Sequence, residues 1–372
     1  MTLAQPGAPA EAAERELLEE SLDRLFRTAI SSTAGPDAEG AWPTGLWAGL
    51  ADIGAPWLGL PVEQGGTGGD SRHAVLAVAV AARHAAPVPL AESSLLAGWA
   101  LAAAGLDVPQ RVLTAAAGWP PHTLTATRDG DILRVSGSAT GVPWARNSAS
   151  VVTMLAVHGE PAVACLPAAG LRIEEATNLA GEPRDTVTAV DVPVPAGAWA
   201  SAPGGADTLV VRGAAARCVA IAAVAQRVVE LSVAHARDRV QFDRPIAQFQ
   251  AVQHHLARLA GAAAAAQAAA HLAARALAGV GPSARLDAAA AKVVASEAAA
   301  QAAALAHQVH GAIGMTREHE LHRFTRRLWS WRDEFGTEHR WAAELGRAVA
   351  ATPGDAWAAL VPAAGRGNSA ER

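Results

Sequence analysis

The sequence predicts an α+β protein whose segments follow the order helical, β, helical. Apolar side chains recur at the spacing of amphipathic helices near the N-terminus and again beyond residue 206. Between these regions the chain alternates apolar and polar residues in short runs separated by turn signals. These two observations divide the chain into an N-terminal helical domain over residues 1–117, a middle β domain over 118–205, a C-terminal helical domain over 206–351 and a flexible tail over 352–372.

The N-terminal segment is expected to contain helices interrupted by one glycine-dense loop. This loop, GLPVEQGGTGGD at residues 59–70, cannot be crossed by a helix without a loss of stability. The first helix is amphipathic and needs a partner surface for its apolar face. That face consists of Leu17, Leu18, Leu22, Leu25, Phe26 and Ile30. Further helices are expected around Leu46, Leu50 and Ile53, and through residues 73–86 and 95–106.

The middle segment carries the signals of a small β domain. The stretch TLTATRDGDILRVSG at residues 123–137 alternates in polarity, and Asp129-Gly130 within it is a hairpin turn signal. The runs VVTMLAV, AVACLP and TVTAVDVPV follow, and each is typical of a strand.

The C-terminal segment is expected to form long helices that pack closely. Its alanine-rich run AAAAAQAAAHLAARALA favours a helix, because alanine is the best helix former and is small enough to let helices approach. One helix face is predicted to carry Ile221, Val224, Val228 and Leu231, and another Val252, Leu256 and Leu259.

Composition disfavours several other classes of protein. The chain has no uninterrupted run of about 18 apolar residues, so no membrane span is expected. The N-terminus shows no basic segment followed by an apolar one, so we expect a cytoplasmic protein without a secretory signal. Cys165 and Cys218 lie far apart and suggest neither a disulfide framework nor a metal cluster. A net charge of -5 and a pI near 6.2 disfavour an extended nucleic-acid surface.

Histidines are also interpreted as structural rather than metal-binding. We expect them on polar helix faces, and no carboxylate or cysteine accompanies them in the pattern that a metal site needs. The residues concerned are His254, His255, His319 and His322.

Three motifs occur within this order of segments. They are GLPVEQGGTG at residues 59–68, RVQFDRPIAQFQAVQHHLA at 239–257 and QVHGAIGMTREHELHRFTRR at 308–327. Together with the segment order, they resemble the acyl-CoA dehydrogenase family over nearly the whole chain, most weakly between about residues 105 and 205. The resemblance implies an N-terminal helical domain, a middle β-barrel or sandwich and a C-terminal four-helix bundle.

The resemblance also implies a binding site for FAD that is shared between subunits. In the family, the arginine matching Arg239 and the aromatic matching Phe242 reach the FAD of a neighbouring subunit, and an arginine can pair bidentately with a phosphate. Glycine at 311 would let the backbone approach a bulky ligand. The cofactor-binding residues implied in this way are Arg239, Gln241, Phe242, Gln250, Gln308, Val309, His310, Gly311, Ala312 and Thr337.

Both positions of the family's general base lack an acid. In most members a glutamate before a Gly-Thr pair removes the α proton of an acyl thioester while hydride passes from the β carbon to the flavin. Here Phe335 precedes Gly336-Thr337. Other members place the base at the start of the helix that runs into the FAD arginine, where this chain has Gly213. We therefore assign no catalytic residue.

Two further departures concern substrate and flavin binding. Arg212 and Arg217 lie near the family's acyl-CoA-binding arginine but out of register with it. Family members hold the flavin ring with a Thr-Glu-Pro segment followed by Gly-Ser-Asp, and residues 115–137 contain neither. The chain thus keeps the motifs for the far end of FAD and lacks those for its reactive ring.

These features favour a subunit of a hetero-oligomer. Steroid-side-chain acyl-CoA dehydrogenases of actinobacteria resemble this arrangement, being α2β2 tetramers with one FAD per heterodimer. A second subunit of the same type would bring the glutamate and the pocket for an acyl-CoA or acyl-carrier thioester, and an electron-transfer flavoprotein is the expected electron acceptor.

Two alternatives remain open at this stage. The chain is an active homo-oligomer with a relocated base, such as Glu334 or Glu338, or it is a non-catalytic interaction protein that has lost the cofactor. The presence of Arg239, Phe242, Gln250 and Gln308 argues mildly against the second of these.

Overall fold

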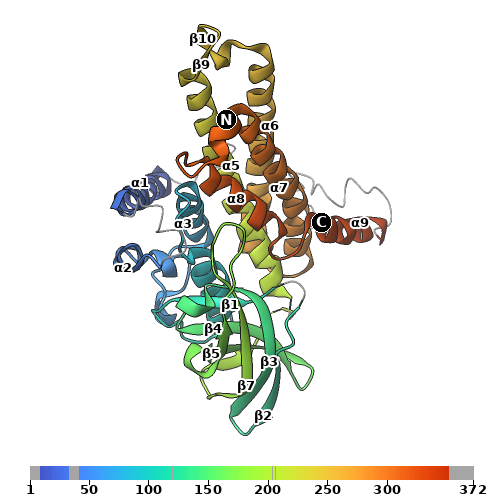
Figure 1. Ribbon diagram of the computed structural model, residues 1–372. Helices are drawn as coiled ribbons and strands as arrows, with labels where there is room; N and C mark the ends of the chain where they lie inside the picture. Colours follow the sequence, from blue (N-terminus) through green and yellow to red (C-terminus); the bar gives the residue numbers. More distant parts are fainter. Residues whose placement is uncertain (1–8, 33–41, 119–120, 203, 206, 352–372) are drawn as a thin grey trace, which may run out of the picture.

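The computed structural model describes residues 9–32, 42–118, 121–202, 204–205 and 207–351. Over these residues it confirms the predicted order of N-terminal helices, central β-sheets and C-terminal helices (Figure 1). The predicted tail over 352–372 lies outside the described residues.

The N-terminal helices pack through alanine and leucine side chains. Leu22 and Phe26 of α1 are fully buried, whereas Leu17 on the same helix is 65% exposed, so only part of the predicted apolar face is covered. The side chain of Ile30 lies outside the described part. The elements are α1 (Pro9–Ser32), α2 (Thr44–Asp52), the short helices η2 (Ala55–Trp57) and η3 (Val62–Gln64), α3 (Ser71–Arg83), the π-helix η4 (Ala91–Gly98) and α4 (Trp99–Ala103).

The middle segment forms two four-stranded sheets around a shared apolar core. The predicted hairpin turn is confirmed, since β2 ends at Asp129, Gly130 has φ 61°, and β3 pairs back antiparallel. One sheet has the order β1 (Leu113–Ala116), β4 (Ser150–Val157), β5 (Glu160–Pro167), β8 (Trp199–Ser201), and the other β2 (Thr125–Asp129), β3 (Ile132–Pro143), β7 (Arg184–Val194), β6 (Arg172–Glu174). Single turns η5 (Ala145–Asn147) and η6 (Ala168–Gly170) connect them. Strand β1 precedes residue 118 and pairs parallel with β4, so the first sheet takes a strand from the N-terminal segment.

The C-terminal segment is a bundle of long helices. The predicted inner face of α5 is confirmed, because Ile221, Val224 and Val228 are fully buried and Leu231 is 9% exposed. Alanines line the contacts of α6 and α7, which allows their backbones to approach closely. The elements are α5 (Thr208–Asp238), α6 (Gln250–Ala278), α7 (Gly281–His310), η8 (Gly311–Met315), α8 (Leu321–Asp333) and α9 (Glu338–Ala351).

Helix α5 is long and apolar enough to cross a membrane by length and composition. However, 89% of its most apolar 18-residue window is buried inside the protein. It is therefore a core helix of the bundle, surrounded by α3, α6, α7 and α8.

A small hairpin connects α5 to α6 at the end of the bundle remote from the sheets (Figure 1). It consists of β9 (Val240–Gln241) and β10 (Arg244–Pro245), followed by the single turn η7 (Ile246–Gln248). Its two central residues, Phe242 and Asp243, have φ 52° and 60°, the left-handed pair that a type I′ turn requires. Asn and Gly usually fill these positions, so the chain accepts strain to place a phenylalanine at the tip.

Candidate functional site

The structure brings most of the predicted cofactor-binding residues to one end of the bundle. Arg239 ends α5 and Gln250 begins α6, and the hairpin with Gln241 and Phe242 lies between them. The end of α7 joins this group, because the rings of His235 and His310 stack with centroids 4.5 Å apart. We call the segments 239–250 and 308–312 together the distal clamp.

Two residues of the distal clamp project from the protein with few partners. Phe242 is 86% exposed, and its ring lies edge-on to that of Phe249, at 6.1 Å between centroids. The Arg239 side chain is exposed and forms no hydrogen bond or ion pair with the described residues. An exposed, unpaired guanidinium is suited to a phosphate, and an exposed aromatic ring to a planar ligand or a second protein surface.

The 308–312 segment is only partly available to a ligand. Gln308, Gly311 and Ala312 are exposed, whereas Val309 and His310 are 6% and 5% exposed and pack inside the chain. Gly311 ends α7 with φ 64° and ψ -147°, a backbone region that glycine alone enters readily. The exposed backbone at 311–312 remains free to approach a ligand.

Thr337 does not join the distal clamp. It lies before α9, where its hydroxyl accepts a bond from Arg340 N–H at 3.4 Å. Phe335, two residues before Thr337, packs on Gly213 near the start of α5, and Arg239 caps the end of that helix. Gly213 and Arg239 are 26 residues apart in the sequence, which corresponds to about 39 Å along the helix axis. The clamp thus faces away from the region where this chain would hold a base.

The two positions that lack an acid are in direct contact with each other. A methyl group added at Gly213 would lie 2.3 Å from Cδ1 of the Phe335 ring, so the ring rests on the bare backbone of α5. Phe335 is 6% exposed and has φ 56°. Its carbonyl accepts a hydrogen bond from Trp341 Nε1 at 3.0 Å, which fixes the turn. The phenyl ring therefore fills the space, and glycine at 213 is required for it to fit.

Glu334 is engaged by two arginines and an amide. Arg184 donates from Nε at 2.7 Å and Arg217 donates from Nε at 2.7 Å. Asn178 Nδ2 donates at 3.0 Å. Burial alone would raise the pKa of Glu334, but the charges of Arg184 and Arg217 outweigh it and lower the pKa to about 2. A carboxylate with so low a pKa is a poor proton acceptor.

These ion pairs extend into a network between α5, α8, η4 and the segment before β7. Arg217 also pairs with Glu92 at 2.6 Å. Glu182 accepts from Arg184 at 3.0 Å, Arg327 at 2.9 Å and Trp331 Nε1 at 3.0 Å. The charged atoms of this network are almost fully shielded from solvent, and the three carboxylates balance the three guanidinium groups.

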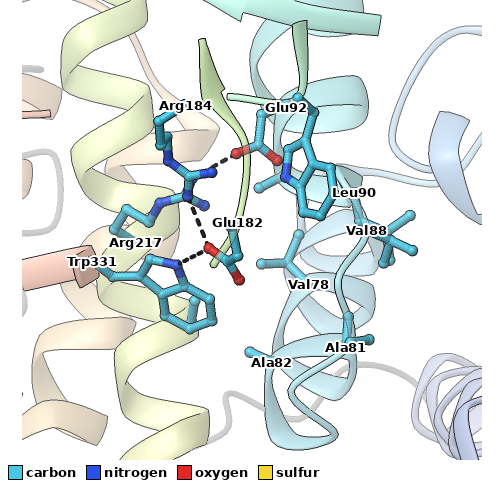
Figure 2. Close-up of a pocket in the computed structure, with 14 residues that line it drawn as sticks. Val78, Ala81, Ala82, Val88, Leu90, Glu92, Glu182, Arg184, Arg217 and Trp331 are labelled. Atoms are coloured by element: carbon cyan, nitrogen blue, oxygen red, sulfur yellow. Dashed lines mark hydrogen bonds and ion pairs between the residues drawn. The ribbon is translucent and has the colours of Figure 1, made fainter. Parts of the chain in front are cut away.

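The network encloses a small cavity, shown in Figure 2. Its volume of about 30 Å³ holds one or two water molecules, since a water needs at least about 10–15 Å³. Apolar side chains of α3 and its following loop form the opposite wall, including Val78 and Leu90. The cavity is therefore far too small for an acyl thioester.

The sequence analysis missed this network. The signal available was a few charged residues in otherwise apolar runs, such as Glu92 in LAESSLLAGWAL and Arg217 in α5. Such charges are costly to bury unless they are paired. Arg212 follows the same pattern but bonds to carbonyls, with Nε 2.8 Å from Leu95 O, and it stacks on Trp99 at 3.8 Å.

The histidine interpretation needs one correction. His319 is not on a helix face but lies in the turn before α8, where its ring is 4.7 Å from that of His310. Sequence spacing could not predict that His235, His310 and His319 lie close together, because they come from three separate segments.

The residues present fit one end of FAD better than the other. The distal clamp offers an unpaired arginine, an exposed aromatic and exposed glycine backbone, a donor set suited to phosphates and an adenine. The cavity lined by Glu92, Glu182 and Arg217 is too small for a flavin ring or its substrate, and the ring of Phe335 fills the space over Gly213.

Comparison with known proteins shows the family of the chain and its fold. Two protein-family models match the chain, the N-terminal domain of acyl-CoA dehydrogenases over residues 12–114 and their C-terminal domain over residues 207–349. The chain is 32% identical over 329 residues to acyl-CoA dehydrogenase IpdE2 of Mycobacterium tuberculosis, covering 84% of this chain and 90% of that relative.

Solved structures share the fold. A chain of the ChsE4-ChsE5 complex from Mycobacterium tuberculosis matches with a TM-score of 0.78 at 24% identity, covering 91% of this chain and 98% of that chain. The Tcur3481-Tcur3483 steroid ACAD G363A variant matches with a TM-score of 0.80 at 23% identity and the same two coverages. At these identities the likeness shows the fold.

Proposed function

Because the chain belongs to the acyl-CoA dehydrogenase family, we propose that it acts as the FAD-supporting subunit of a hetero-oligomer whose partner carries the catalytic glutamate. The bound FAD would accept hydride from the β carbon of an acyl thioester. This chain would supply Arg239 and Phe242 to the phosphates and adenosine, and its partner would supply the base and the substrate pocket.

The contact between Phe335 and Gly213 carries the proposal. At position 335 the phenyl ring stands in place of an acid. At position 213 an acidic side chain would collide with that ring, because the ring occupies the space above Gly213. The neighbouring carboxylates are all paired with arginines, so no side chain lining the cavity is free to take a proton. This supports a proton acceptor supplied by another chain.

A relocated base within this chain receives no support. Glu334 has a pKa of about 2 and is bonded to Arg184 and Arg217. Glu338 begins α9 and does not line the cavity. The homo-oligomeric alternative would therefore need a base other than Glu334 or Glu338.

The names of related proteins support a proposal for the partner subunit and the substrate. One of the matched structures is the ChsE4-ChsE5 complex, and another carries the paired name Tcur3481-Tcur3483 and is called a steroid ACAD. We propose a partner of the same fold, a CoA or carrier-protein thioester held by that partner, and an electron-transfer flavoprotein as acceptor. The assembly would work in the cytoplasm.

Co-expression tests the proposal. The chain is purified without a tag, alone and together with the acyl-CoA dehydrogenase encoded beside it, and FAD is measured from the visible absorbance of each sample. We expect FAD in the complex and none in the chain alone. A chain that alone binds FAD and reduces it with an acyl-CoA would refute the assignment.

Two variants locate the clamp within the complex. Arg239→Ala should lower FAD occupancy while the two chains still elute together. The control Arg258→Ala removes an equally exposed arginine from α6 and should leave occupancy unchanged. Equal occupancy in both variants would exclude a pyrophosphate contact by Arg239.

A further inference from the structure

Three histidines gather at the distal end of the bundle. His235 lies in the last turn of α5, His310 ends α7 and His319 lies in the turn before α8. The ring centroids of His310 are 4.5 Å from His235 and 4.7 Å from His319. One nitrogen from each ring can be chosen so that all three lie within 4.8 Å of one another.

The tautomer of His310 is set by its backbone contact. Its Nδ1 lies 2.8 Å from the carbonyl oxygen of Ala306, which can only accept, so Nδ1 carries the proton. The lone pair is then on Nε2. That atom is buried and has no hydrogen-bond partner among the described residues. Because His310 is only 5% exposed, solvent does not readily supply one. An imidazole that donates from one nitrogen to a carbonyl while the other points inward is the usual arrangement of a metal-ligating histidine.

The other two rings allow the same role. His235 makes only ring contacts within the described chain, so both of its nitrogens are available. His319 Nδ1 accepts the Leu321 N–H at 3.1 Å, which places its proton on Nε2. Ligation through Nε2 needs the proton to move to Nδ1, and the Leu321 amide, in the first turn of α8, would then lose this acceptor.

The donor atoms of this group determine which ions it could hold. No carboxylate or thiol belongs to the group. Imidazole ligands alone suit Zn²⁺, Co²⁺, Ni²⁺ or Cu²⁺, and they do not suit Ca²⁺ or Mg²⁺, which need oxygen ligands.

We propose that His235, His310 and His319 form a site for a divalent transition-metal ion such as Zn²⁺, with a fourth coordination position open to water. A tetrahedral ion with bonds of 2.0–2.1 Å needs nitrogens roughly 3.3 Å apart, so the rings must close further than in the free chain. His319 can move, since it lies on a turn rather than within a helix. The bound ion would tie α5, α7 and the start of α8 together four residues before Arg239.

Plain aromatic packing is the competing explanation. Rings of phenylalanine would stack equally well and would leave no buried nitrogen without a partner. The unpaired Nε2 of His310 is the feature that packing does not account for.

Metal titration of the full-length, tag-free chain tests the site. After removal of metals by a chelator, Zn²⁺ binding is followed by calorimetry, and Co²⁺ is added separately because its visible bands report coordination geometry. We expect one ion per chain and the intense bands of tetrahedral Co²⁺. Either no binding, or several weak sites with octahedral bands, would overturn the proposal.

Histidine variants assign the ligands. His310→Phe keeps an aromatic ring and should weaken Zn²⁺ binding by more than about 100-fold, since loss of outer-shell partners alone costs up to about 100-fold. His235→Gln, at a less buried position, should do the same and serves if His310→Phe does not fold. His271→Gln, an exposed histidine of α6, is the control and should bind as the wild type does. Unchanged binding in His310→Phe or His235→Gln would contradict the assignment.

Discussion

Glu334 and Phe335 are neighbours in the chain, yet one side chain is bound by charged groups and the other packs on the backbone of a helix. The carboxylate of Glu334 is bound by Arg184 and Arg217, and the ring of Phe335 rests on Gly213 with the Arg217 guanidinium 5.4 Å from its centroid. The change of direction between adjacent residues explains why an acid one position away cannot replace the missing base. Residue identity at 335 was readable from the sequence, but the pairing of Glu334 was not, because Arg184 lies 150 residues away.

Truncating the ring of Phe335 should destabilise the protein strongly. Phe335→Ala leaves a cavity on α5, and buried phenylalanine-to-alanine changes cost about 3–5 kcal/mol. The matched variant Phe242→Ala removes an 86% exposed ring and should change the free energy of unfolding by less than about 0.5 kcal/mol. Urea denaturation of both variants measures the difference. Similar values for the two would mean that Phe335 does not pack on Gly213.

Removing the charge of Glu334 should also destabilise the protein, and the loss should depend on pH. Glu334→Gln leaves Arg184 and Arg217 without one shared partner, which costs on the order of 3 kcal/mol at neutral pH. The pKa of Glu334 in the folded protein, about 2, lies below its ordinary 4.5. Its contribution is therefore complete above about pH 4.5 and is lost as the pH falls towards 2.

Denaturation at pH 6 and pH 3 checks this dependence. The difference between wild type and Glu334→Gln should shrink at the lower pH. The control Glu174→Gln breaks an exposed ion pair with Arg172 and should cost less than about 1 kcal/mol at both values. A difference that stays constant between pH 6 and pH 3 would show that Glu334 is not held ionised by the two arginines.

At the scale of elements, α8 carries the residues that close the cavity, and a buried lysine fixes its end. Lys292 of α7 is the only lysine in the chain and is fully buried. Its Nζ donates to the carbonyls of Trp331 at 2.7 Å and Arg332 at 2.9 Å, two of the groups that a helix leaves unpaired at its C-terminus. Burial lowers the pKa of Lys292 to about 8.

Replacing this lysine should loosen the end of α8. Lys292→Met fills similar space but removes the side-chain donor of the Trp331 carbonyl and leaves the Arg332 carbonyl with the Ser296 hydroxyl alone, which costs about 1–3 kcal/mol. Hydrogen exchange of the α8 amides should accelerate more than exchange in the β-sheets. Uniform acceleration across the chain would contradict a local role for the cap.

The periodic features of the elements were the predictable ones. The buried face of α5 and the Asp129-Gly130 turn follow from local patterns, and both are confirmed. The outcome for Leu17 was not predictable, since its 65% exposure depends on how far the partner surface extends. Contacts between distant elements, such as His235 with His310, need the tertiary arrangement.

At the scale of the whole molecule, the distal clamp and the contact of Phe335 with Gly213 lie towards opposite ends of α5. The order of domains and the family were predictable, because three motifs and the segment order agree over most of the chain. The buried ion-pair network was not, because Glu92, Glu182 and Arg217 come from three separate regions. To the missing acid the structure adds the contact of Phe335 with Gly213, about 39 Å along α5 from the distal clamp.

The most direct test is the ratio of FAD to protein chains in the purified complex with the partner dehydrogenase. It is measured by flavin absorbance after denaturation and by mass spectrometry of the intact assembly. Our account predicts one FAD for each pair of unlike chains, because we propose that the partner holds the flavin ring. One FAD for every chain would contradict it, since this chain would then hold a flavin of its own beside Phe335.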